Sequence, residues 1–173
     1  MTVKWKFFGL ICVLQMLATA FFSITSFINL FQTSGFYFLL QTIAFVLMTW
    51  LAIHALNILN INYPDNPIVG KQKTIFNWLF LLNFLLIAFL FGLIISEYRQ
   101  LKELAALIDR SLFTLPFKWL ITLLVYFIML VFHFIILYGL YAIRIELYRN
   151  FMNRQFDFEK KFPESINRTT TTP

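Results

Sequence analysis

Charged residues and cysteine are both scarce in this chain of 173 residues. Only 13% of the residues are charged and 60% are hydrophobic, whereas an average soluble domain is about a quarter charged. Cys12 is the single cysteine, so the chain forms no intramolecular disulfide framework and no cluster of thiolate metal ligands. This composition excludes a small water-soluble domain and indicates a membrane protein.

The sequence also lacks the patterns that support catalysis inside a membrane. It contains no HExxH, no GxSxG and no pair of aspartates, and no Asp or Glu lies within its long apolar runs. Ser23, Ser26 and Cys12 are possible nucleophiles, but no histidine is expected close enough to act as their base. We therefore predict a protein that is not an enzyme and that binds no metal or cofactor.

Four apolar runs are long enough to cross a bilayer, which requires about 20 residues in a helix. They are continuous and carry no strict alternation of polar and apolar residues. The sequence therefore predicts an all-α integral membrane four-helix bundle that forms one domain over residues 1–162. The predicted spans are residues 7–31, 35–60, 75–96 and 117–144.

The first run also imitates a secretory signal peptide. Lys4 and Lys6 precede an apolar stretch that reaches Ala18-Thr19-Ala20, an A-x-A cleavage pattern. The apolar run continues well beyond this point, where a cleaved protein would normally become polar. We therefore expect the segment to remain as the first helix.

Two of the predicted helices continue beyond the hydrocarbon region. Residues 97–113 and 145–162 combine charged residues with apolar residues at offsets of three and four, which predicts amphipathic extensions of the third and fourth helices. The first of these extensions either stands off the membrane or lies along it. Residues 163–173, rich in threonine, are expected to form a disordered cytoplasmic tail.

Basic residues are distributed unequally between the two ends of the predicted bundle. Ten Lys and Arg lie in the N-terminus, the second loop and the tail, against four on the opposite side. The positive-inside rule then places both termini in the cytoplasm. The net charge of +6 is explained by anchoring to anionic lipid, and we expect no nucleic acid partner. Abundant Phe, Ile and Asn with little Gly suggest a bacterial inner membrane.

Small residues recur on one side of three helices, which permits close helix packing in lipid. On the first helix the spacing of 3, 4, 3, 4, 3 is typical of left-handed packing, and on the third helix a small-xxx-small series could pack within the chain or form a dimer. The residues are Gly9, Cys12, Met16, Thr19, Ser23 and Ser26 on the first helix, Gln41, Ala44, Ala52 and Ala55 on the second, and Ala88, Gly92 and Ser96 on the third.

One strongly hydrogen-bonding side chain occurs on each helix within the same leaflet. At 1.5 Å per residue, Gln15 and Asn83 lie about 12 Å from the cytoplasmic boundary, His54 about 9 Å and His133 about 16 Å. Because an unsatisfied polar group in hydrocarbon is costly, all four are expected to point inward. Interhelical hydrogen bonding is the favoured interpretation. Ligation of one haem by the two histidines is a further alternative, but helix tilt would have to compensate for their difference in depth of about 7 Å.

The sequence thus predicts a non-enzymatic membrane protein that acts as a subunit or accessory of a membrane complex. Self-association is expected through Ala88, Gly92 and Ser96, and the predicted partners are membrane lipid and a second copy or another membrane protein. The alternative is a small oligomeric channel or transporter. Its constriction would be lined by Gln15, His54, Asn83 and His133.

Overall fold

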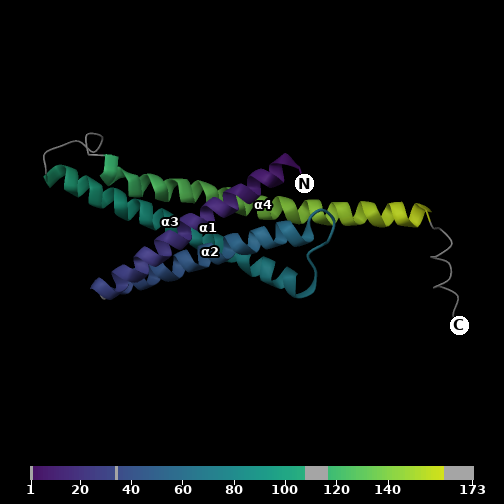
Figure 1. Ribbon diagram of the computed structural model, residues 1–173, viewed down its shortest axis with the longest axis horizontal. Helices are drawn as coiled ribbons and strands as arrows, with labels where there is room; N and C mark the ends of the chain where they lie inside the picture. Colours follow the sequence, from purple (N-terminus) through teal and green to yellow (C-terminus); the bar gives the residue numbers. More distant parts are fainter. Residues whose placement is uncertain (1, 34, 108–116, 162–173) are drawn as a thin grey trace.

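The computed structural model describes residues 2–33, 35–107 and 117–161, and this part of the chain forms four α-helices (Figure 1). They are α1 (Val3–Thr33), α2 (Phe36–Asn62), α3 (Gly70–Leu107) and α4 (Phe117–Lys161). Each contains a segment long and apolar enough to cross a membrane. The prediction of an all-α four-helix membrane bundle is therefore confirmed.

The link between α2 and α3 contains the residues that interrupt helical structure. α2 ends at Asn62, two residues before Pro64, and Pro67 follows within the link. α3 then begins at Gly70, whose φ of 53° lies in the left-handed region that glycine adopts without steric penalty. The proline-rich link therefore reverses the chain direction between the two spans.

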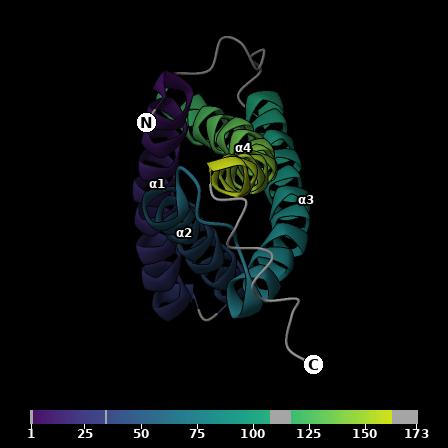
Figure 2. The same ribbon diagram turned by 90° about the vertical axis from the view of Figure 1, so that its right-hand side faces the viewer.

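The bundle consists of two antiparallel hairpins that cross at an angle. α1 pairs with α2 and α3 pairs with α4, and the two pairs form an elongated X (Figure 1). Seen along the long axis, α4 lies between the other three helices, all of which it contacts (Figure 2). The start of α1, the α2–α3 link and the end of α4 lie toward one end, which we call the proximal end.

The buried apolar side chains form two large clusters, one nearer each end of the bundle. The proximal cluster draws on all four helices and the distal cluster on α2, α3 and α4. The completely buried members of the proximal cluster include Cys12, Ala52, Ile136, Ile143 and Leu147. Those of the distal cluster include Phe45, Met48, Leu90 and Met129.

The small residues of α1 and α2 face the interior, as their spacing indicates. Cys12 and Thr19 are completely buried, and Gly9 lies at the α1–α2 contact, where a Cβ atom would be 3.4 Å from Cδ2 of Leu59. Ser23 is only partly exposed. The close approach of α1 and α2 therefore uses this stripe.

The small residues of α3 lie on the other side of their helix. Ala88 and Gly92 are exposed, and a Cβ atom at Gly92 would meet nothing within 4 Å. Ser96 is partly exposed. Of the two arrangements considered for this series, packing within the chain does not occur at Ala88 or Gly92.

Both extensions are continuous with their membrane-spanning helices. α3 runs without a break to Leu107, and Leu101 and Ala105 are buried against Leu120 and Leu123 of α4. α4 has 45 residues and is thus about 67 Å long, roughly twice the hydrocarbon thickness. The predicted tail, residues 163–173, and residues 108–113 of the first extension lie outside the described residues.

Gly139 determines how closely α1 approaches α4. Phe8 is 4% exposed, and a Cβ atom at position 139 would lie 2.1 Å from its Cε2 atom. The aromatic ring therefore packs directly on the α4 backbone. No other residue type leaves room for it, because every other side chain begins with a Cβ atom.

We expect Gly139→Ala to lower the free energy of unfolding by about 1–3 kcal/mol, the usual effect of overpacking. Ala106→Leu is the control, since it adds side-chain volume at an exposed position of α3. Unfolding in detergent, followed by tryptophan fluorescence, measures both variants. Equal effects of the two substitutions would contradict the packing of Phe8 on α4, and in a Phe8→Ala background the effect of Gly139→Ala should diminish.

Candidate functional site

A layer of polar side chains separates the two apolar clusters. On α3, Asn83 lies between Leu79 of the proximal cluster and Leu86 of the distal cluster. On α4, His133 lies between the two clusters in the same way. We call this set of residues the polar layer: Gln15, Thr19, Thr49, Asn83 and His133.

Gln15 and His133 form a hydrogen bond between α1 and α4. Nε2 of Gln15 lies 2.8 Å from Nδ1 of His133, and both residues are completely buried. An amide nitrogen can only donate, so Nδ1 of the imidazole accepts and the ring proton lies on Nε2. The structure therefore brings together two of the four polar residues that the sequence indicated.

Four buried polar atoms make no hydrogen bond to any residue that the structure describes. They are Oε1 of Gln15, Nε2 of His133, and both Oδ1 and Nδ2 of Asn83. With the proton on Nε2, the set contains two donors and two acceptors. Leaving such groups unpaired in hydrocarbon costs several kcal/mol each. The polar layer contains no carboxylate that could balance the charge of a bound cation.

His54 does not share the environment of the other three residues. It is partly exposed, and its ring centroid lies 6.2 Å from that of Trp50, one turn earlier on α2. The expectation that it points inward with Gln15, Asn83 and His133 is therefore not met. The side of α2 that faces the interior carries Met48, Leu51, Ala52 and Ala55 instead.

Two further interhelical hydrogen bonds were not anticipated as pairs. Oγ1 of Thr19 lies 2.8 Å from Oγ1 of Thr49, and Nε2 of Gln41 donates to the Tyr126 hydroxyl at 3.2 Å. The sequence does not indicate an interhelical role for Thr49, because a threonine hydroxyl in a membrane-spanning helix can donate to a carbonyl of its own helix. Thr49 also makes such a bond, to the carbonyl of Phe45. These bonds join α1 to α2 and α2 to α4.

Charged residues at the proximal end hold α4 to its neighbours. Glu146 accepts hydrogen bonds from Lys4 and from Nε1 of Trp5, the latter at 3.0 Å. Farther along α4, Arg154 forms an ion pair with Asp65 of the α2–α3 link. The extension of α4 is therefore fixed to α1 on one side and to the link on the other.

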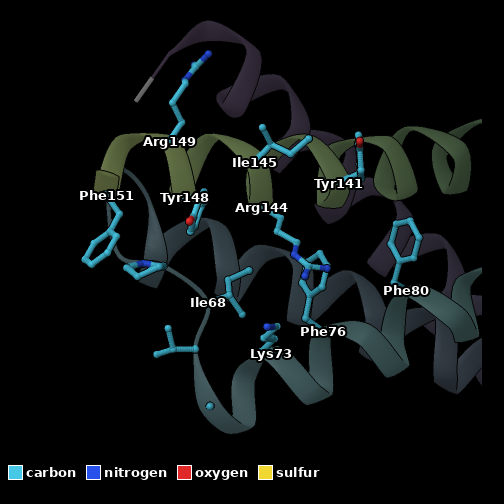
Figure 3. Close-up of a pocket in the computed structure, with 13 residues that line it drawn as sticks. Ile68, Lys73, Phe76, Phe80, Tyr141, Arg144, Ile145, Tyr148, Arg149 and Phe151 are labelled. Carbon is cyan, nitrogen blue, oxygen red and sulfur yellow. The ribbon is translucent and has the colours of Figure 1, made fainter. Parts of the chain in front are cut away.

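A groove of about 860 Å³ opens at the same end, between α4, the first turns of α3 and the α2–α3 link (Figure 3). Its walls are largely aromatic and aliphatic, and three cationic residues line it. The cations are Lys73, Arg144 and Arg149. No sequence motif indicates this groove, because its residues come from three segments that only the fold brings together.

No protein family, curated protein sequence or solved structure matches this chain. Four apolar helices of membrane-spanning length, arranged as a bundle with an internal polar layer, define an integral membrane protein of the four-helix class.

We expect Gln15→Leu and His133→Leu each to destabilise the protein, because each leaves the other partner unpaired in the interior. The double variant should lose less than the sum of the two, with a coupling of about 0.6–2 kcal/mol. Unfolding free energies of the four proteins in detergent measure the coupling. His54→Leu, at a partly exposed site, is the control and should change stability little; additive effects of Gln15→Leu and His133→Leu would contradict the hydrogen bond.

Proposed function

We propose that this protein is a non-enzymatic subunit or accessory of a membrane complex, and that it associates with a second copy of itself through the outer face of α3. The observation that carries this proposal is the exposure of Ala88 and Gly92. Within lipid, helices associate through close backbone approach, which small residues permit. Here the chain's own helices leave these two positions unoccupied.

The surroundings of this face favour a helical partner. Larger apolar residues flank the two small ones on the exposed side of α3, among them Leu85, Phe91 and Ile95, which are 64%, 45% and 50% exposed. The helix surface is therefore hollowed at Ala88 and Gly92 and raised on either side. A second α3 could place its own ridge in this hollow.

A role without catalysis agrees with the position of the most nucleophilic side chain. Cys12 is completely buried in the proximal cluster among apolar residues. Reactive cysteines normally lie in partly exposed, electropositive surroundings that favour the thiolate. Cys12 is therefore proposed to serve packing.

The proposed location is a bacterial inner membrane, with both termini in the cytoplasm. Lys4, Lys71 and Lys73 belong to the proximal end, together with the basic residues of the α4 extension. This distribution follows the positive-inside rule. The proximal end would then face the cytoplasm.

We expect the protein in mild detergent to have the mass of a dimer or a larger assembly. Replacing Ala88 and Gly92 together by Leu should shift it to the monomer, because the added side chains keep two helices apart. Mass measurement by light scattering gives the outcome. Ala106→Leu, at another exposed small residue of α3, should leave the assembly intact; a monomeric parent protein would refute self-association.

A channel or transporter is the second candidate, supported by the unpaired donors and acceptors of the polar layer. Such groups could replace the hydration of a small polar solute as it crosses. In that case vesicles containing the protein would take up a small neutral solute faster than empty vesicles. Asn83→Leu would return the rate to that of empty vesicles, and equal rates for all three preparations would exclude transport of the solute tested.

A further inference from the structure

The groove at the proximal end combines a cationic rim with an apolar floor. Phe76 and Phe80 of α3 and Tyr141 and Ile145 of α4 line its floor and walls, and Ile68 of the link closes one side (Figure 3). Phe76 and Phe80 are one turn apart and their rings stack, with centroids separated by 6.3 Å. This turn extends the apolar surface by about 6 Å along α3.

Lys73 and Arg144 supply the positive charge on the groove side. The Arg144 guanidinium donates to Oδ1 of Asn77 at 3.2 Å and lies 5.4 Å from the centroid of the Phe76 ring. Figure 3 shows Arg144 reaching from α4 toward Phe76, whereas Arg149 points to the other side of α4. Arg144 is therefore oriented into the groove by two contacts.

Two cations at this end have carboxylate partners, and neither of them lines the groove. Lys4 pairs with Glu146 and Arg154 pairs with Asp65. Among the described residues, neither Lys73 nor Arg144 forms an ion pair, and no acidic residue lines the groove. The groove therefore has uncompensated positive charge next to aromatic walls.

An occupant that complements both features is anionic at one end and apolar along the rest. A phosphate group favours Arg and Lys donors, and an acyl chain favours the aromatic floor. Basic pockets between membrane helices are known to hold anionic headgroups at the cytoplasmic surface. A free phosphate ion would leave the apolar floor uncovered, and a soluble acidic peptide would not reach a surface that continues along the spanning helices.

We propose that this groove binds one anionic phospholipid from the surrounding membrane. Lys73 and Arg144 hold the phosphate, and one acyl chain lies along the partly exposed ring of Phe80, beside the buried Phe76. The bound lipid fills the space between α3, α4 and the α2–α3 link, so it stabilises the proximal end of the bundle. This site is separate from the α3 face of the proposed self-association.

Native mass spectrometry of the full-length protein, with phosphatidylglycerol or phosphatidylcholine added to the detergent, tests the proposal. The protein should retain one phosphatidylglycerol more tightly than phosphatidylcholine. Lys73→Gln should weaken that binding about tenfold, the size expected for loss of one charge-assisted hydrogen bond. Lys73 forms no hydrogen bond within the described residues, so the variant is expected to fold normally.

Lys71→Gln is the matched control, because it removes the same charge two residues away without lining the groove. It should leave the affinity unchanged. Equal weakening by Lys71→Gln and Lys73→Gln would mean general surface attraction and would overturn the proposal, as would equal retention of the two lipids.

Phe80→Ala separates a lipid from a free anion. It should weaken retention of phosphatidylglycerol, because the acyl chain loses part of its floor. Millimolar inorganic phosphate should not displace the lipid. Displacement by phosphate, together with no effect of Phe80→Ala, would assign the groove to a free anion and refute the lipid site.

Discussion

The antiparallel contact between α1 and α4 fixes the position of the other elements. Because α4 lies between the other three helices, its pairing with α1 sets where the polar layer and the proximal end fall. In hydrocarbon this pairing cannot depend on exclusion of water, so it requires close approach and hydrogen bonding. Its contacts are Trp5 with Glu146, Phe8 with Gly139, Gln15 with His133, and Phe22 with Tyr126.

The polar layer gives this pairing its specificity. Apolar surfaces of the two clusters could slide past one another at little cost, since lipid is as apolar as the side chains they contact. A displacement of α1 by one turn would separate Gln15 from His133 and leave both unpaired in the interior. Asn83 of the same layer makes no side-chain hydrogen bond to any residue that the structure describes, so it does not contribute to this alignment.

The two surfaces proposed for interaction differ in their chemistry and position. The outer face of α3 at Ala88 and Gly92 is apolar. It suits a second helix, because the two small side chains allow the backbones of the two helices to come close together. The proximal groove presents Lys73 and Arg144 above aromatic walls and suits an anionic amphiphile. The two proposed interactions use separate surfaces, so the protein could assemble with a second copy while its proximal end remains bound to lipid.

The sequence by itself determined the number, type and approximate limits of the helices, because transfer of an apolar run into hydrocarbon depends on local composition. It also indicated that Gln15 and His133 would be buried. Only the tertiary structure decided which face of each helix turns inward, since that depends on the neighbouring helices. For this reason His54 is partly exposed although its depth resembles that of Gln15, and Gly139 makes room for the Phe8 ring although it belongs to no small-residue series.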